Sequence, residues 1–476
     1  MKNKSNGFIS DALKLASSSL VTQFASLLML PIVTRIFKPD IFGSLAILEL
    51  FITQLGGIIT LGFAGAIVLT KSKKQEINHI WFSLSATILI SCLSVILVFY
   101  SSHISQIIKH DYLASLFWFI PISALLWGLR DILRFLNLKY KRYYTISISN
   151  VLLSVSLNVF AIYLGYQYGG TILNYIIASL TATIISIIIL SYKFIRSSVV
   201  SFIRGFELSV IKEQIVVHKQ FIYYNLPTSY VSRLTNDIPI WILAFYFSNI
   251  FIGLFAFANR MISIPINLIS SSLAQVFYQR AADDLENNLN NISKSSIFLF
   301  QISLPMFLLL GLYGGEMFSI IFGNDWHKAG IIAKALCFVG IVKFSFNPLS
   351  DLFIVLNKQN IALYKELTLI ICTIISFLIG GILNMPIIGV LIFSISNAII
   401  ISIFQFYILG VAGCNMIDFR KKIFKPLLSL SPVFLYLAIN IRLNLIVEVF
   451  LILIVVSLYY YNFSKKYNLK KLYKKK

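Results

Sequence analysis

Charged residues are scarce in this sequence. Only 12% of its 476 residues are charged, whereas 58% are hydrophobic. A soluble domain averages about 25% charged residues, so the composition excludes an ordinary soluble globular protein. Apolar runs longer than the roughly 18 residues that indicate a membrane span recur along the chain. One of them, 151–192, contains no charge at all. The sequence therefore predicts an all-α integral membrane protein.

Motifs of metal sites and of common enzymes are also missing. The five histidines form no HExxH, and neither GxxxxGK[ST] nor GxSxG occurs. The four cysteines are far apart and form no CxxC pair, so neither a metal site nor a disulfide framework is indicated: Cys92, Cys337, Cys372 and Cys414. We expect no cofactor, no ATP-hydrolysing domain within this chain and no enzymatic activity.

Hydropathy predicts about fourteen transmembrane helices of roughly 20 residues each. They are expected at 12–36, 41–69, 78–100, 113–136, 144–166, 171–192, 221–247, 250–276, 295–313, 329–356, 362–383, 386–410, 424–441 and 445–462. The longest outer loop is expected at 314–328.

Basic residues gather in alternate loops. The chain has 40 Lys and Arg against 18 Asp and Glu, a net charge of +22. On a soluble protein this excess would indicate nucleic acid. Here the basic residues lie between apolar runs, which is the pattern of the positive-inside rule. We expect a multi-pass protein of the cytoplasmic (inner) membrane with both termini in the cytoplasm, and no nucleic-acid partner. The basic tail is interpreted as a topology anchor, with contact to anionic membrane lipids as the alternative.

The longest polar segment divides the chain. It lies between the sixth and seventh predicted spans and separates two sets of six helices. The predicted organisation is an N-lobe at 1–192, a cytoplasmic linker at 193–220, a C-lobe at 221–410, and a C-terminal helix pair with a basic tail at 411–476.

A weak internal repeat supports two related lobes. Superposing Gly43 on Gly253 places Ala46 on Ala256 and Glu49 on Asn259. Two six-helix halves in the same orientation imply a pseudo-twofold axis along the membrane normal.

A few charges lie inside the predicted spans. A charge at the bilayer centre costs about 2.5–3.5 kcal/mol on insertion scales, so such residues face protein or water. Arg233 and Asp237 are four residues apart and share one helix face. They either neutralise each other or face a hydrated cavity. Together with Glu49, Arg260 and Lys343 they leave a positive surplus, which suits an anionic ligand.

Three stretches resemble a known family. They are "LPIVTRIFKPDIFGSLAILE" (30–49), the segment 221–283 that opens with "FIYYNLPTSYVSRLTNDIPIW", and "IIFGNDWHKAGIIAKAL" (320–336). In their order and spacing they resemble the O-antigen and lipid-linked oligosaccharide flippases of the polysaccharide transporter family. That family belongs to the multidrug/oligosaccharidyl-lipid/polysaccharide exporter superfamily. The resemblance covers most of 10–410.

The resemblance implies a flippase that moves oligosaccharide repeat units on undecaprenyl diphosphate from the cytoplasmic to the outer face. Two pseudo-symmetric six-helix lobes would alternate access to a central cavity. Its lining is expected to include Arg35, Glu49, Arg233, Asp237, Arg260 and Lys343. Asp237 and Glu49 are the candidates for binding a coupling ion, H+ or Na+. A polysaccharide polymerase and a chain-length regulator are the expected protein partners.

Three alternatives stay open. A drug/cation antiporter of the same superfamily would have a more acidic cavity than this sequence predicts. A membrane polysaccharide polymerase or ligase would usually have larger outer loops. A non-transporting scaffold of the assembly complex would not need charges inside the membrane.

Overall fold

The computed structural model describes residues 21–70, 72–108, 110–195, 226–283, 285–350, 352–356 and 358–429. Throughout this part of the chain the regular structure is helical, and no strand occurs. The predicted linker falls outside the described residues apart from 193–195, and the predicted C-terminal helix pair falls outside beyond 429.

The chain forms two compact units. Unit 1 consists of Met1–Leu268, Tyr313–Leu336 and Leu363–Asn397. Unit 2 consists of Ile269–Leu312, Cys337–Ala362 and Ala398–Lys476. The two lobes predicted from the sequence have other boundaries and remain a prediction.

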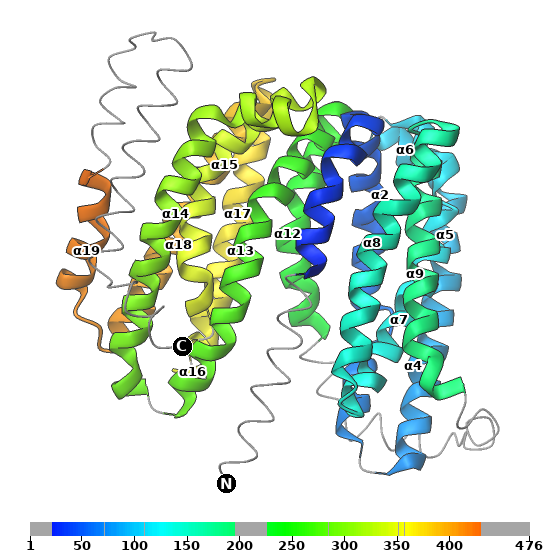
Figure 1. Ribbon diagram of the computed structural model, residues 1–476, viewed down its shortest axis with the longest axis horizontal. Coiled ribbons are helices and arrows are strands. Elements are labelled where there is room, and N and C mark those ends of the chain that lie inside the picture. The colour runs from blue at the N-terminus through cyan, green and yellow to red at the C-terminus, as the bar shows by residue number, and fades with distance from the viewer. Residues whose placement is uncertain are drawn as a thin grey trace. The chain divides into compact units, whose positions relative to one another are not determined.

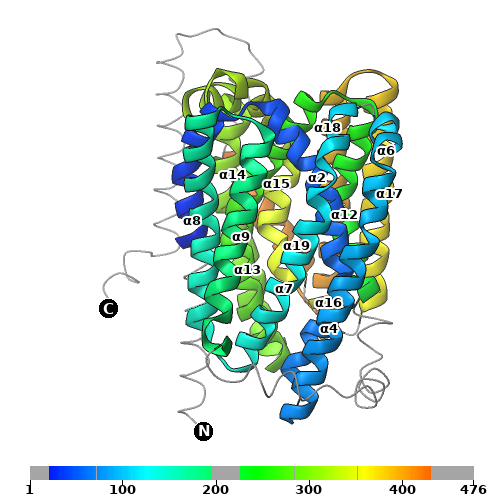
Figure 2. The same cartoon turned by 90° about the vertical axis from the view of Figure 1, so that its right-hand side faces the viewer.

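The first half of the chain supplies most of unit 1 (Figure 1). After a first helix, Val21–Ile36, it contains α2 Pro39–Ile58, α3 Phe63–Ala66, η1 Ile67–Leu69, α4 Lys73–Leu93, α5 Val95–Phe99, α6 Ser101–Ile107, η2 Asp111–Leu116, α7 Phe119–Lys139, α8 Tyr143–Tyr168 and α9 Ile172–Ile195. Helices α8 and α9 pack side by side, and α7 packs against both α4 and α9 (Figure 2).

The second half begins with α12, which packs along α2. Its elements are α12 Leu226–Tyr246, α13 Asn249–Asp283, α14 Leu285–Phe322, η4 Asn324–Trp326, α15 His327–Phe346, η5 Asn347–Leu349, α16 Leu352–Val355, α17 Gln359–Ile382, α18 Pro386–Val411 and α19 Met416–Ser429.

Nine helices of the described chain are long and apolar enough to cross a membrane. The predicted all-α membrane fold is therefore confirmed, while the number fourteen remains a prediction. Helix α12 has 21 residues but is not among the nine. Its polar residues, Arg233 and Asp237 included, lower its mean hydropathy.

The second predicted span, 41–69, is wrong in its length. Helix α2 ends at Ile58. Leu61 and Gly62 then adopt left-handed conformations, with φ of 49° and 78°. The short helices α3 and η1 complete the apolar run. The hydropathy of this run is that of a helix, but its glycines permit a turn that hydropathy does not detect.

The predicted outer loop at 314–328 is also wrong, because α14 continues as far as Phe322. It bends at Tyr313, where φ is −111° and ψ is 16°. Beyond the bend, Gly314 lies so close to α15 that an added Cβ would come within 2.6 Å of the Gly330 carbonyl oxygen. Glycine marks a close helix contact here rather than a loop.

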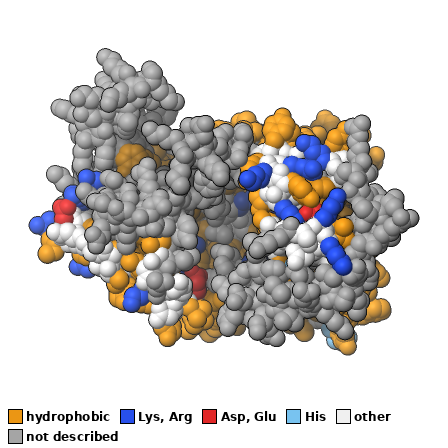
Figure 3. All heavy atoms as spheres, turned by 90° about the horizontal axis from the view of Figure 1, so that it is seen from below, with side chains coloured by type: hydrophobic (Ala, Val, Ile, Leu, Met, Phe, Trp, Pro, Cys, Tyr) orange, Lys and Arg blue, Asp and Glu red, His pale blue; other side chains and the backbone are white. Residues whose placement is uncertain are grey.

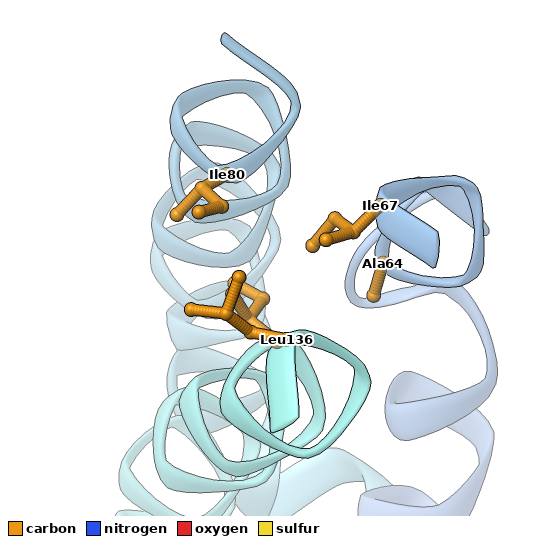
Figure 4. Packing of buried hydrophobic residues seen from close by; sticks show 5 residues of the cluster. Ala64, Ile67, Ile80 and Leu136 are labelled. Carbon is orange, nitrogen blue, oxygen red and sulfur yellow. The ribbon is translucent and has the colours of Figure 1, made fainter. Parts of the chain in front are cut away.

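One end of unit 1 carries basic side chains, and we call it the basic end (Figure 3). Its exposed lysines are Lys73, Lys74, Lys141 and Lys193. Beneath them a small apolar core joins α3, η1, α4 and α7 (Figure 4): Ala64, Ile67, Ile80, Ile132 and Leu136.

The buried Glu76 carboxylate organises this basic end. It pairs with Lys139 and accepts hydrogen bonds from the Tyr140 hydroxyl at 2.9 and 3.0 Å. Partial burial of the phenol, together with this bond to a carboxylate, raises the pKa of Tyr140 to about 12.

The sequence repeat coincides with a structural repeat in unit 1. The first helix ends at Ile36 and α12 ends at Tyr246, and each is followed by two residues before the next helix begins. That next helix begins at Pro39 in one case and at Asn249 in the other, an offset of 210 residues. Equivalent backbone bonds close both turns, Phe37 N to Val33 O and Phe247 N to Leu243 O, each of 2.9 Å.

The repeated helices α2 and α13 touch at their first turns. A Cβ added to Gly43 would lie 2.0 Å from the Asn249 carbonyl oxygen, and one added to Gly253 would lie 1.8 Å from the Pro39 carbonyl oxygen. Because these contacts are equivalent under the offset, a local pseudo-twofold axis passes between the two glycines. Only glycine lets two helix backbones approach so closely.

Candidate functional site

A carboxylate near the middle of α12 is bonded to α2. Asp237 Oδ2 accepts hydrogen bonds from Thr53 Oγ1 at 3.0 Å and from Gln54 Nε2 at 2.7 Å. Both donors belong to the half of α2 that runs toward the basic end. The two bonds explain why Asp237, although half-buried, can be placed inside an apolar helix pair.

Arg233 lies one turn before Asp237 on the same helix, and the two side chains are not joined by an ion pair in the described structure. The guanidinium makes one long bond, from Nη1 to the Thr53 carbonyl oxygen at 3.5 Å. Its stem lies against α2, where a Cβ added to Gly57 would be 3.3 Å from Arg233 Cδ. Of the two alternatives left open by the sequence, neutralisation through a direct ion pair is therefore not what this arrangement shows.

A second pair of opposite charges adjoins the first. Glu49, one turn before Thr53 on α2, interacts electrostatically with Arg260 of α13 and with Asp237. Arg260 also interacts electrostatically with Tyr175 on α9. Glu49 and Arg260 are exposed although each lies well inside its helix, and protein atoms crowd around Glu49.

These residues form what we call the charged network: Glu49, Thr53, Gln54, Tyr175, Arg233, Asp237 and Arg260. It joins α2, α9, α12 and α13 within unit 1. Its charges alternate, because Asp237 lies within electrostatic range of Arg233, and Glu49 of Arg260. Such an arrangement can present guanidinium groups to an anion while the carboxylates limit the excess of positive charge.

One of the predicted lining residues, Arg35, does not join this network, and a second, Lys343, lies in the other unit. Arg35, at the end of the first helix, donates to the Ile320 carbonyl oxygen at 3.4 Å, near the last turn of α14. Lys343 lies on α15 in unit 2, so its position relative to the network is not defined. The structure thus brings four of the six predicted residues together.

The sequence reasoning missed Thr53, Gln54 and Tyr175. A signal was present for Thr53, because Glu49 and Thr53 are four residues apart and share the polar face of an otherwise apolar helix. Tyr175 gave no signal, since a tyrosine in a membrane helix is common and its contact with Arg260 depends on the packing of α9.

An aromatic cluster lies at the end of unit 1 opposite the basic end. Trp326 is fully buried and donates from Nε1 to the Thr34 carbonyl oxygen at 2.9 Å. Its ring packs on Phe42 of α2 and Phe257 of α13, with centroid distances of 5.0 and 4.2 Å. Glu49 lies about 10 Å further along α2 than Phe42, at 1.5 Å per residue. The cluster therefore holds together the helix ends next to the charged network.

No metal site accompanies the network. Among the described residues, no group of three or more His, Cys, Asp or Glu side chains is placed to hold a metal ion.

Solved structures with a similar fold are membrane proteins. The lipid II flippase MurJ in an inward closed conformation matches with a TM-score of 0.74 and 15% identity, covering 96% of this chain and 99% of that one. An inward-facing multidrug resistance MATE family transporter of the MOP superfamily matches at 0.61 and 12%, covering 86% and 99%. A MATE protein in the straight conformation matches at 0.53 and 13%, covering 87% and 96%. The fold thus defines an all-α membrane protein of the MurJ and MATE type.

The family follows from the sequence. Residues 32–330 match the model of the family described as "Polysaccharide biosynthesis protein", and the chain belongs to this family. A comparison with curated proteins finds no match.

Proposed function

We propose that this protein is a flippase for a lipid-linked oligosaccharide. The cargo would be a repeat unit of O-antigen or a related surface polysaccharide on undecaprenyl diphosphate, moved to the outer face of the cytoplasmic membrane. The observation that carries this proposal is Arg233, a half-buried guanidinium with one long hydrogen bond, inside a helix of a polysaccharide biosynthesis family member. The fold shared with the lipid II flippase MurJ supports it.

The chemistry of a diphosphate matches the charged network. A guanidinium binds phosphate oxygens through parallel N–H donors, and such charge-assisted bonds strengthen away from bulk water. Arg233 and Arg260 supply these donors, and Lys343 is a further cation proposed from the sequence. Asp237 and Glu49 are the candidate sites for a coupling ion, H+ or Na+. The predicted N-lobe and C-lobe would move against each other between inward-open and outward-open states.

Cell-biological features of the proposal come from the sequence. The positive-inside bias supports a location in the cytoplasmic membrane with both termini in the cytoplasm. A polymerase and a chain-length regulator are the protein partners proposed for later steps. No enzymatic step is proposed for this chain.

A drug/cation antiporter is the second candidate function. Asp237 and Glu49 favour it, because carboxylates inside membrane-type helices suit cations. The family match favours a polysaccharide cargo instead.

The test is deletion of the gene with complementation, followed by assay of lipid-linked repeat units on each face of the membrane. We expect repeat units to accumulate on the cytoplasmic face, to be cleared by the wild type and by Lys141→Ala, and not by Arg233→Ala. Lys141 is an exposed lysine of the basic end and is the matched control. Repeat units that reach the outer face but stay unpolymerised would contradict the flippase and support a polymerase or ligase. Unchanged repeat units with altered drug resistance would support the antiporter.

A further inference from the structure

We propose that Thr53 and Gln54 are positioning residues that hold Asp237 on α2 and thereby keep the Arg233 guanidinium available for a diphosphate. This inference rests on the flippase proposal for the identity of the anion. Its structural part, the separation of Asp237 from Arg233, does not.

The spacing of the two charges makes their separation informative. Side chains four residues apart on a helix are neighbours, and an arginine and an aspartate at this spacing readily form an ion pair. Here no such pair forms in the described structure. Both hydrogen bonds from α2, at 3.0 and 2.7 Å, end on the same oxygen, Oδ2 of Asp237. The carboxylate is therefore turned toward α2 by two donors from consecutive residues.

Thr53 contacts both charges. Its hydroxyl donates to Asp237, and its backbone oxygen accepts the 3.5 Å bond from Arg233 Nη1. The arginine stem lies in the space left by the missing side chain of Gly57, at 3.3 Å from an ideal Cβ. Helix α2 thus holds apart two charged groups that would otherwise form an ion pair. Asp237 bonds to the side chain of Thr53, whereas Arg233 bonds to its backbone and lies beside Gly57.

The functional consequence concerns competition. If Arg233 were paired with Asp237, an arriving diphosphate would have to displace a carboxylate from the guanidinium. With Asp237 held by neutral donors, the remaining N–H groups of Arg233 can bind phosphate oxygens directly. Removing the two donors should therefore weaken anion binding without removing either charge.

A rescue experiment separates this role from a merely structural one. The variants are Thr53→Val/Gln54→Leu, which keeps side-chain size but removes both donors, and the same pair combined with Asp237→Asn. The probe is undecaprenyl diphosphate added to the full-length protein in nanodiscs. We expect the double variant to bind about tenfold more weakly, and the triple variant to bind within about threefold of the wild type, because the competing charge is gone. Thr53→Ser, which keeps the hydroxyl, should bind as the wild type does.

A second measurement does not depend on the ligand. Phenylglyoxal modifies arginine, and mass spectrometry of the digested protein follows each site. We expect Arg233 to react more slowly in the double variant and at the wild-type rate in the triple variant, with Arg420, an exposed arginine of α19 outside the charged network, as internal reference.

The outcomes distinguish the two proposals. Unchanged reactivity of Arg233 in the double variant, or loss of reactivity that Asp237→Asn does not restore, would overturn the positioning role. If reactivity follows the expected pattern but the wild type does not bind undecaprenyl diphosphate, the positioning role stands and the proposed cargo falls.

Discussion

Two helical hairpins of unit 1 have the same backbone course but different chemistry. The first joins the helix Val21–Ile36 to α2, and the second joins α12 to the first turns of α13. Their helices end and begin at residues offset by 210, the spacing of Pro39 and Asn249, and the reciprocal glycine contact lies between them. Their charges do not repeat. Gln23 stands where the second hairpin has Arg233, and Leu27 stands where it has Asp237.

The same asymmetry is found on the second helix of each hairpin. Glu49 of α2 corresponds to Asn259, and Leu50 corresponds to Arg260 of α13. The backbone geometry is thus the same in the two hairpins where the helices cross closely, while the charged side chains differ. A polyprenyl diphosphate has no twofold symmetry, so a symmetric framework with asymmetric charges suits the proposed cargo.

The largest effect is expected from breaking the element that the hairpins share. Gly253→Leu would place side-chain atoms on the Pro39 backbone, where even a Cβ comes within 1.8 Å. Since backbone cannot move aside as a side chain does, we expect a loss of at least about 3 kcal/mol of stability and no export. Gly43→Leu should behave alike. The measurement is Tm in detergent together with glycan export.

The matched control is Gly311→Ala in unit 2. Among the described residues, an added Cβ there meets only Cys337 Sγ, at 4.0 Å. Wild-type Tm in the Gly253→Leu protein would contradict the close crossing of α2 and α13.

The next effect comes from moving the arginine to its equivalent position. We expect Gln23→Arg/Arg233→Gln to transport at least about tenfold more slowly than the wild type, because charge-assisted bonds worth about 1.5–3 kcal/mol are lost. The new arginine would face Leu27 in place of Asp237. The rate of clearance of cytoplasmic-face repeat units measures this. Full activity of the exchanged protein would show that the two hairpins are interchangeable.

A smaller effect is expected at the second helix. Glu49→Gln leaves Arg260 with Tyr175 but removes its carboxylate partner, and the two charged groups form no direct ion pair in the described structure. We expect about a fivefold change in the apparent affinity for undecaprenyl diphosphate, in the direction of tighter binding, because a competing negative charge is lost. The equivalent change Asn259→Asp, which adds a negative charge, should weaken binding. Equal affinities in all three proteins would exclude Glu49 from the site.

The smallest effect lies at the basic end, outside both hairpins. The pKa of Tyr140 is raised to about 12, above the ordinary value near 10. A group with a raised pKa contributes stability that is complete below its unfolded pKa and is lost as pH rises through the folded one. Between pH 10 and 12 we therefore expect Tm to fall by at most about 2 °C more in the wild type than in Tyr140→Phe. Parallel Tm curves would contradict the raised pKa of Tyr140.

Much of the fold could be predicted from hydropathy. The all-α membrane class and the positions of most helices agree with the structure, because crossing a bilayer requires long apolar segments whatever their packing. The two wrong predictions both lie at glycines, because glycine occurs in turns as well as in close contacts between helices. Gly62 turns the chain inside a predicted span, whereas Gly314 continues a helix that was predicted to end.

The candidate site could be predicted in part. Glu49, Arg233, Asp237 and Arg260 stood out because charges inside apolar segments are costly, and the structure brings all four into one network. Arg35 was predicted on the same grounds, but it donates to the Ile320 carbonyl oxygen at the end of α14 and lies outside the network. Hydropathy assigns depth along one helix, and it does not tell which face meets which neighbour.

The sequence by itself determined the all-α class, the polar character of α12 and the repeat offset, because each follows from residue type and spacing along one segment. Only the tertiary structure decided that Asp237 bonds to Thr53 and Gln54 rather than to Arg233. Both partners were possible for that carboxylate, and the choice depends on α2 packing against α12 in one rotational setting. Hydrogen bonds act over about 3 Å, a scale that local sequence patterns do not specify for residues distant along the chain.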